Sequence, residues 1–237
     1  DAIISVTVDP SPIVVGNDSY TNIIAGTTPN PVGNVLPNDS INGQPVTLGG
    51  SGNTTLVVKT PATGTIVPVL DPTTGSVIVP VATPAGPYII VYTLCEKLNA
   101  NVAVPNCKDA TITVNVGAPP IVAANDTYSG INGANGNSNV GNALVNDLLN
   151  GSLATVGVGG NTTLAVNTPA SPVLGAPVGA PVPVLAPATG IVAVPAGTPA
   201  GTYTISYKLC DQVNPTNCKD ATITVTVDPA PIAAQPD

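Results

Sequence analysis

The sequence predicts an all-β protein built from two tandem β-sandwich repeats. The first observation is strict alternation of apolar and polar residues, with many β-branched side chains, in segments such as Tyr203–Leu209 and Ala221–Val227. The second is the abundance of turn formers, 24 Gly and 27 Pro in 237 residues. The third is an internal repeat of about 110 residues, which is the size of one sandwich domain.

The repeat is visible by direct comparison of the two halves. Ile13–Tyr20 returns 108 positions later as Ile121–Tyr128. The offset grows to 115 at Pro183–Leu185, which places seven extra residues near Ser171–Ala180. It then falls to 111 at Cys218–Val225. Length changes confined to short connections are typical of tandem copies of one fold, because loops tolerate insertions.

The ends of the sequence continue the same pattern. Ser5–Ile13 matches the last strand and linker of a repeat, Thr224–Ile232. We therefore expect residues 1–12 to be the last strand of a preceding repeat plus a linker, 13–120 and 121–231 to be complete repeats, and 232–237 to start a following repeat. The chain is then expected to be a segment of a longer array, cut in phase with the repeat.

Each repeat should hold seven or eight strands. In order, the first repeat predicts strands at 13–20, 32–36, 45–48, 55–60, 67–70, 76–79, 88–94 and 107–116, with counterparts in the second repeat. This number of strands in about 110 residues is typical of a two-sheet immunoglobulin-like sandwich. Ala200–Tyr203 also stands where such folds carry a tyrosine corner.

Proline marks the junctions between repeats. Each of the linkers Asp9–Pro12, Gly117–Pro120 and Asp228–Pro231 contains two prolines. Proline fixes φ and favours extended geometry in the residue before it. The linkers are therefore expected to act as semi-rigid spacers, giving an extended rod.

The four cysteines point to two structural disulfides. Cys95 follows a predicted strand and Cys107 begins the next, and Cys210 and Cys218 hold the same places in the second repeat. A bond within each pair closes a hairpin between neighbouring strands. A redox or metal site needs CxxC spacing or histidine, and the sequence has neither. The disulfides imply an oxidising compartment outside the cytosol.

Composition argues against several function classes. The chain has no His, only 5 basic residues and a net charge of −8. It lacks the commonest general base and the charge that nucleic-acid binding requires. No apolar run approaches the length of a membrane span. We therefore expect no enzyme activity, no nucleic-acid partner, no membrane insertion and no required cofactor.

Calcium is the one metal that the sequence makes possible. The recurrent Asn-Asp pairs offer four candidate ligands, Asp18, Asp39, Asp126 and Asp147. Calcium takes six to eight oxygen ligands, usually with several carboxylates, whereas each pair offers one carboxylate. Because Asn-Asp also caps turns through its side chains, we favour the turn interpretation over the calcium site.

Several separated motifs together indicate a family. The segments are Ala124–Tyr128, Asn139–Asp147, Pro183–Leu185, Thr198–Tyr203 and Leu209–Asp211. In this order they resemble repeats of giant Bacteroidetes surface proteins, in particular SprB-type gliding-motility adhesins exported by the type IX secretion system. They are also similar to immunoglobulin-like and cadherin-like repeats of other large bacterial adhesins.

The resemblance implies an extracellular filament on a bacterial cell surface. Its implied partners are neighbouring repeats of the same chain, an extracellular surface or glycan, and outer-membrane gliding or secretion machinery. It also implies O-glycosylation at Ser40 in the Asp39-Ser40 motif, which the second repeat lacks because Leu148 replaces the serine.

Two main functions follow. The repeats act as a structural spacer or shaft for adhesion or gliding, or each repeat is a polysaccharide-binding module. The absence of a distinctive aromatic cluster favours the spacer. Lateral assembly into a pilus-like polymer stays open as a third hypothesis.

Overall fold

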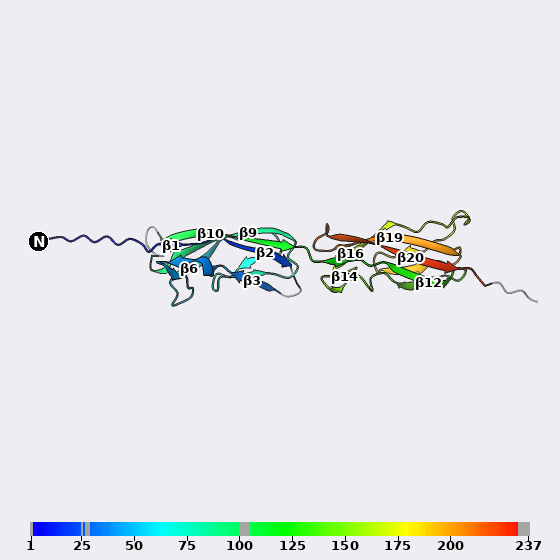
Figure 1. Ribbon diagram of the computed structural model, residues 1–237, viewed down its shortest axis with the longest axis horizontal. Coiled ribbons are helices and arrows are strands. Elements are labelled where there is room, and N and C mark those ends of the chain that lie inside the picture. The colour runs from blue at the N-terminus through cyan, green and yellow to red at the C-terminus, as the bar shows by residue number, and fades with distance from the viewer. Residues whose placement is uncertain (1, 25, 27–28, 100–104, 232–237) are drawn as a thin grey trace, which may run out of the picture. The chain divides into compact units, whose positions relative to one another are not determined.

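The chain folds into two compact units of similar architecture. The structure is a computed structural model that describes residues 2–24, 26, 29–99 and 105–231 (Figure 1). The units span Asp1–Ala118 and Pro119–Asp237. The predicted start of a following repeat, 232–237, lies outside the described residues. Among the described residues, no helix has the length and hydropathy needed to span a membrane.

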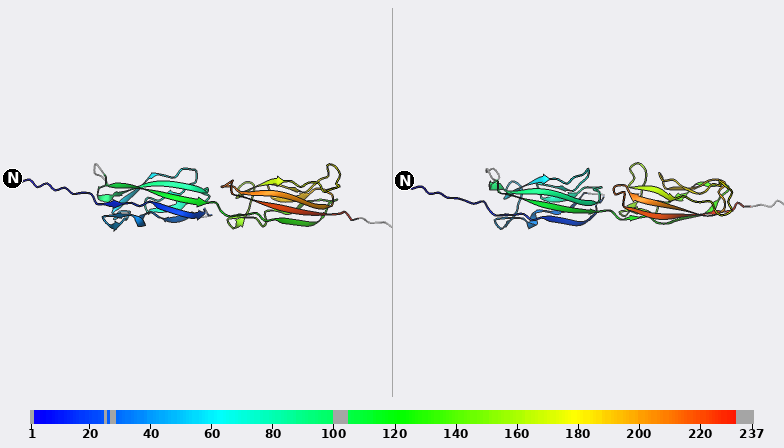
Figure 2. Two further views of the ribbon diagram at one scale, coloured as in Figure 1. Left: turned by 45° about the horizontal axis from the view of Figure 1, so that its top comes forward. Right: turned by 90° about the horizontal axis from the view of Figure 1, so that it is seen from above.

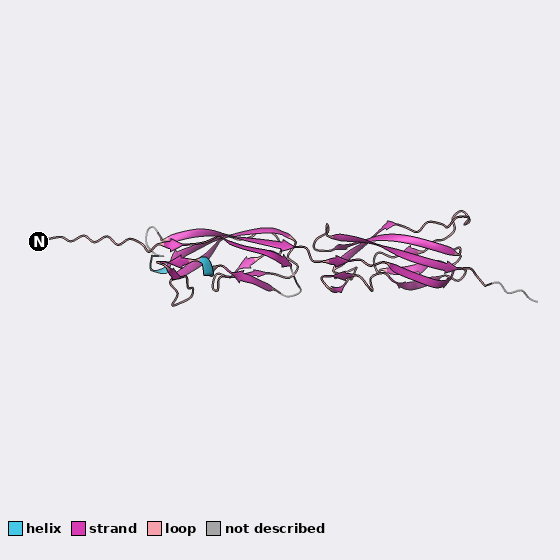
Figure 3. Cartoon of the chain, viewed as in Figure 1, coloured by secondary structure: helices cyan, strands magenta, loops and turns pink. Residues whose placement is uncertain are grey.

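The first unit contains ten strands and two short 3₁₀ turns in its described part. They are β1 (Ile13–Val14), β2 (Asp18–Ile24), β3 (Asn30–Asn34), η1 (Leu36–Asn38), β4 (Ser40–Ile41), β5 (Gln44–Pro45), β6 (Thr54–Thr60), β7 (Val69–Leu70), β8 (Ser76–Val79), β9 (Gly86–Glu96), η2 (Lys97–Asn99) and β10 (Cys107–Gly117). Figure 3 shows how little of the chain is helical.

The second unit repeats this order of strands. They are β11 (Ile121–Val122), β12 (Asp126–Asn132), β13 (Asn137–Asn142), β14 (Leu148–Leu149), β15 (Ser152–Leu153), β16 (Thr162–Thr168), β17 (Val184–Leu185), β18 (Ile191–Val194), β19 (Gly201–Asp211) and β20 (Cys218–Asp228). The seven extra residues lie between β16 and β17, where backbone hydrogen bonds Ala176–Val173 and Ala180–Pro177 close two turns.

Each unit is a sandwich around one hydrophobic core (Figure 2). In the first unit a four-stranded sheet has the order β2-β10-β9-β6, and two small sheets have the orders β3-β8-β7 and β1-β4-β5. Side chains from the large sheet, such as Ile90 and Leu94, and from β8, such as Val77 and Val79, belong to the same core. The all-β sandwich class predicted from the sequence is thereby confirmed.

The long strands follow the pattern that predicted them. Along β9, alternate residues from Ile90 to Glu96 are buried, because successive strand residues point to opposite faces. At the position of the expected corner, the Tyr203 hydroxyl donates a hydrogen bond to the Pro199 carbonyl at 2.7 Å, and Tyr88 does the same to Pro84 at 2.8 Å.

Several shorter elements differ from the expectation. The strand expected at 13–20 is broken between Val14 and Asp18, so that it contributes to two sheets. The segment expected as a strand at 32–36 turns into η1 at Leu36, with proline in its first turn. Pro45 ends β5 after two residues. Proline lacks the N–H that continues a strand ladder, which explains the last two differences.

Candidate carboxylate–tyrosine clusters

The structure brings the four candidate aspartates together in pairs, one pair in each unit. In the first unit Asp18 and Asp39 meet at the hydroxyl of Tyr92, which lies 3.2 Å from Asp18 Oδ2 and 3.2 Å from Asp39 Oδ2. Tyr92 is fully buried and Asp39 is 3% exposed. We call Asp18, Asp39 and Tyr92 the first cluster, and Asp126, Asp147 and Tyr207 the second cluster.

Local sequence places the two aspartates of the first cluster. Asp18 begins β2, and Asp39 follows η1, where its N–H bonds to the Leu36 carbonyl at 3.0 Å. The Gly16 N–H donates to Asp39 Oδ1 at 2.8 Å. A Cβ at Gly16 would lie 2.7 Å from the Asn38 amide nitrogen, so glycine permits this close approach of the chain.

The asparagines of the Asn-Asp pairs serve the backbone. Asn17 Oδ1 accepts a hydrogen bond from the Thr111 N–H at 2.9 Å, which ties this turn to β10. Asn38 Nδ2 donates to the Asn17 carbonyl and to Asp18 Oδ1, both at 3.2 Å. These contacts join segments that are far apart in the chain rather than capping a local turn, and the turn interpretation of the motif stays a prediction.

The second cluster repeats the arrangement. The Ala124 N–H donates to Asp147 Oδ1 at 2.7 Å, and the Tyr207 hydroxyl lies 2.9 Å from Asp147 Oδ2. The same hydroxyl lies 3.0 Å from the Ala124 carbonyl. Asp126 is 7% exposed, and its Oδ2 is buried without a hydrogen-bond partner. Asp147 and Tyr207 have no exposed surface.

Burial changes the acidity of these groups. Desolvation, together with the nearby charge of Asp39, raises the pKa of Asp18 from 3.8 to about 6. Desolvation and the charge of Asp147 likewise raise the pKa of Asp126 to about 6. Desolvation also raises the pKa of Asp39 and Asp147, although the hydrogen bonds from backbone N–H groups oppose that rise. Tyr92 and Tyr207 have strongly raised pKa values, again chiefly through burial.

The clusters do not fit calcium. Among residues 2–24, 26, 29–99 and 105–231, no group of three or more His, Cys, Asp or Glu side chains could hold a metal ion. In the first cluster the space between the two carboxylates is taken by a phenol oxygen, and one Asp39 oxygen already accepts a backbone N–H. A calcium ion needs six to eight oxygens around it.

Both disulfides are present. Cys95 bonds to Cys107 and Cys210 bonds to Cys218, at the point where β9 pairs with β10 and β19 pairs with β20. As the strand pattern suggested, each disulfide closes one hairpin.

The acid that follows the first cysteine of each pair has a role that sequence reasoning missed. Glu96 is 4% exposed and accepts hydrogen bonds from the Ser11 hydroxyl and from Asn106 Nδ2, each at 2.8 Å. Asp211, 2% exposed, accepts from the Val213 N–H and from Asn214 Nδ2. Their shared place beside a cysteine in both repeats was the available signal.

Ser40, the predicted glycosylation residue, lies on β4 and is half-buried. It pairs with Val14 and Pro45 in the small sheet. The carboxyl group of its neighbour Asp39 points into the first cluster. Modification of Ser40 stays a prediction.

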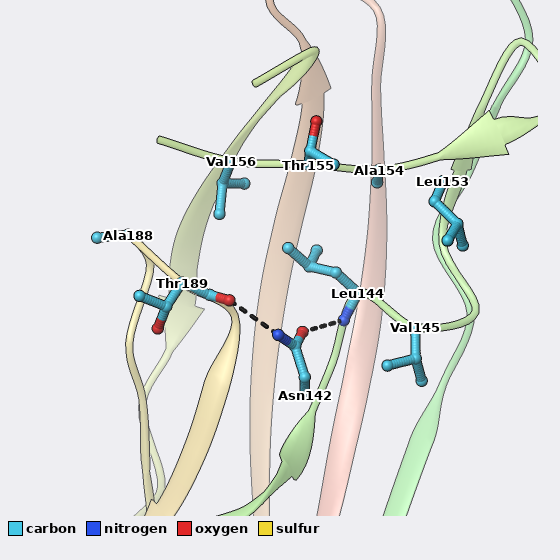
Figure 4. Close-up of a pocket in the computed structure, with 9 residues that line it drawn as sticks. All are labelled: Asn142, Leu144, Val145, Leu153, Ala154, Thr155, Val156, Ala188 and Thr189. Carbon is cyan, nitrogen blue, oxygen red and sulfur yellow. Dashed lines mark hydrogen bonds between the residues drawn. The ribbon is translucent and has the colours of Figure 1, made fainter. Parts of the chain in front are cut away.

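One of the pockets in the second unit is a candidate sugar site (Figure 4). It has a volume of about 480 Å³ and is lined mainly by apolar side chains. Asn142 is its only amide, and both ends of that amide are already bonded, Nδ2 to the Thr189 carbonyl at 2.9 Å and Oδ1 to the Leu144 N–H at 2.8 Å. The pocket therefore offers a sugar neither an aromatic face nor a free amide, and the polysaccharide alternative gains no support from it.

Comparison with known proteins gives weak structural likenesses. No model of a known protein family matches the chain, and no curated protein matches it. Solved structures that resemble it include cadherin domains 3–6 of protocadherin gamma B2, with 11% identity, a TM-score of 0.36, and coverage of 93% of this chain and 53% of that one. Domains 22–24 of mouse cadherin-23 give 12% identity, a TM-score of 0.32, and coverage of 93% and 65%. The human desmocollin-1 ectodomain gives 10% identity, a TM-score of 0.33, and coverage of 92% of this chain and 42% of that one. This chain thus spans about half the length of the first of these.

Proposed function

We propose that this chain is a structural segment of an extracellular adhesin, in which serial β-sandwich repeats form a semi-rigid spacer that bears tension. We further propose that the parent is a bacterial cell-surface filament of the SprB gliding type, on the sequence motifs given above. In this proposal residues 13–120 and 121–231 are complete repeats.

The observation that carries the proposal is the pairing of the terminal strands. In the first unit β2 lies parallel to β10, with Asp18 opposite Ile112 and Ile24 opposite Gly117. The second unit has the same parallel pairing, of β12 with β20. In both units, therefore, an N-terminal strand is hydrogen-bonded directly to the strand by which the chain leaves the unit.

This pairing suits a unit that is pulled at both ends. Tension draws the start of β2 one way and the end of β10 the other, so the two strands must slide along each other. The slanted hydrogen bonds of the parallel ladder are then strained together rather than broken one at a time. A module placed in series in a filament needs this kind of resistance.

The linkers support the semi-rigid part of the proposal. The Pro12 carbonyl accepts a hydrogen bond from the Asn42 N–H, and the Pro120 carbonyl accepts one from the Asn150 N–H, both at 2.8 Å. Asn106 Nδ2 donates to the Ser11 carbonyl at 2.7 Å. The last residues of these linkers are therefore hydrogen-bonded to the unit that follows them. Fewer linker residues are then free to change conformation.

The first residues support the array. Ile4, Val6 and Val8 are 86%, 79% and 86% exposed. Their counterparts in β20, Ile223 and Val225, have no exposed surface. Within the described residues 2–12, this segment thus has the apolar pattern of a final strand without a sheet that buries it, which supports its proposed place in a preceding repeat.

Single-molecule force spectroscopy tests the tension-bearing role. The chain, held by its two ends, should show two unfolding events of similar force. Ser19→Pro, which interrupts β2, should lower the force of one event and leave the other as an internal reference. The matched control is Val57→Pro on the edge strand β6, which lowers thermal stability but lies outside the loaded pair. Unchanged forces in Ser19→Pro would contradict the proposal.

The surface location needs a separate measurement. Antibodies raised against the chain should label intact, unpermeabilised cells of the source organism. Labelling that requires permeabilisation would overturn the cell-surface assignment without affecting the mechanical one.

A further inference from the structure

The two clusters contain more hydrogen-bond acceptors than donors. In the first cluster the Tyr92 hydroxyl has one hydrogen, yet it lies within 3.3 Å of three acceptors: Asp18 Oδ2, Asp39 Oδ2 and the Gly16 carbonyl. One phenol proton satisfies only one of them. When both carboxylates are ionised, the phenol therefore leaves two of these three acceptors without its hydrogen.

The geometry shows which carboxylate is suited to stay charged. Asp39 receives the Gly16 N–H at 2.8 Å, and Asp147 receives the Ala124 N–H at 2.7 Å. A hydrogen bond from a backbone N–H favours the anion. Within the described part of the chain, neither Asp18 nor Asp126 accepts a hydrogen bond from a backbone N–H, so these two are the better places for a proton.

With one proton added, the first cluster forms a continuous chain. The Asp18 acid donates to the phenol oxygen of Tyr92, and the phenol donates to the Asp39 carboxylate. Both oxygen pairs are 3.2 Å apart, slightly longer than a typical O–H···O hydrogen bond, so a small adjustment of the side chains closes the chain. In this chain of hydrogen bonds the protonated Asp18 donates, the Tyr92 hydroxyl both accepts and donates, and the ionised Asp39 accepts.

The second cluster adds an independent sign that something is missing. Asp126 is more than nine-tenths buried, and its Oδ2 has no hydrogen-bond partner. An ionised oxygen in that position is costly, whereas a neutral acid is much less so. The nearby charge of Asp147 adds to the effect of burial on the Asp126 carboxyl group, and both favour its neutral form.

We propose that each cluster folds with one bound proton, carried by Asp18 in the first unit and by Asp126 in the second, which makes both units more stable in mildly acidic than in neutral surroundings.

The groups around each proton support this assignment. Asp18 is faced by Asp39, by Tyr92 on β9 and by its strand neighbour Tyr20. The adjacent strand β10 pairs Ile112, Thr113 and Val114 with β2, none of which titrates. In the second unit Asp126 is faced by Asp147, Tyr207 and Tyr128, and β20 pairs Ile223, Thr224 and Val225 with β12. The titratable neighbours are thus acids and phenols, which do not neutralise an anion.

The direction of the pH dependence follows from linkage. Folding raises the pKa of both aspartates to about 6, so between about pH 4 and 6 the folded chain binds more protons than the unfolded chain. Stability therefore falls as the pH rises through this window and levels off above it. A pKa that rises by about 2 in one aspartate changes the unfolding constant of its folded unit by at most about a hundredfold across the whole window. Because Asp18 is partly exposed, we expect about tenfold in the first unit.

The test compares the wild-type chain with Asp18→Asn/Asp126→Asn in urea unfolding at pH 5 and pH 7.5. The amide mimics the protonated acid in size and charge. We expect the unfolding constant of each wild-type unit to rise by up to about tenfold between the two pH values, since part of the pH 4–6 window lies below pH 5. We expect the variant to be insensitive to pH and more stable than the wild type at pH 7.5.

Two further measurements keep the outcome clear. The control Asp9→Asn/Asp228→Asn removes two exposed charges outside the clusters and should keep the wild-type pH dependence. Carbon-13 titration of the aspartate carboxyl groups in the folded wild type should show two midpoints near 6, whether or not the variant folds.

A variant that is less stable than the wild type at both pH values, with all wild-type carboxyl midpoints near 4, would overturn the proposal. Added calcium that stabilises the wild type but not the variant would also overturn it, because the missing positive charge would then be a metal ion.

Discussion

Removal of the phenol oxygen at position 207 tests how much the second cluster stabilises its unit. Tyr207→Phe keeps the buried ring and deletes only the hydroxyl, which lies 2.9 Å from Asp147 Oδ2 and 3.0 Å from the Ala124 carbonyl. No cavity larger than one oxygen atom results. The change in stability therefore measures the loss of the hydroxyl's hydrogen bonds rather than a loss of packing.

The magnitude follows from the surroundings of Asp147. A hydrogen bond to a charged group contributes about 1.5–3 kcal/mol, and an unpaired buried acceptor costs a similar amount. Asp147 has no exposed surface, so water cannot replace the lost phenol without rearrangement. We expect the free energy of unfolding of the second unit to fall by about 2–3 kcal/mol at pH 7.5. In a unit of this size that is a fall of roughly 10 °C in Tm.

The assay is calorimetry of the full chain at pH 7.5, with the first unit as an internal reference. Tyr203→Phe on the same strand is the matched control, because its hydroxyl bonds only to the neutral Pro199 carbonyl and should contribute about 1 kcal/mol. Equal effects of the two substitutions would refute the special role of the cluster. An equal shift of both units would refute their independence.

Two further predictions concern the same unit. Cys210→Ala/Cys218→Ala opens a short loop and should lower stability by about 2–3 kcal/mol, as measured by urea unfolding, whereas a loss near zero would show that the hairpin needs no covalent closure. Gly141→Ala should destabilise by more than about 1 kcal/mol, because its Cβ would lie 2.1 Å from the Tyr128 ring, whereas Gly50→Ala, with open space around it, should be nearly neutral. Equal melting temperatures for the two glycine variants would contradict this reading.

The sequence was sufficient for those features that depend on local pattern. Period-two alternation located β9, β10 and their copies, since a half-buried strand must alternate. The cysteines that flank these strands located the disulfides, because strands joined in a hairpin bring their facing ends together.

The features that depend on long-range contacts were not accessible. Asp18, Asp39 and Tyr92 are far apart in the chain, and no spacing rule joins these aspartates to a tyrosine that follows them by 74 and 53 residues. The parallel pairing of β2 with β10 is likewise a property of topology, because parallel neighbours are never joined by a short turn. The asymmetry within each pair, one aspartate bonded to a backbone N–H and the other not, depends on the chain path at Gly16 and Ala124.

The clusters and the terminal strands are linked through single residues. Asp18 is both the first residue of β2 and a member of the first cluster, and Asp126 holds the same double position in the second unit. Tension enters the parallel pair at these residues, where the cluster ties the strand to Tyr92 on β9 or Tyr207 on β19. If the proton holds this contact together, then its loss above pH 6 weakens the strand at the point where the load arrives. Unfolding forces should therefore be lower at pH 7.5 than at pH 5, and the difference should disappear in Asp18→Asn/Asp126→Asn.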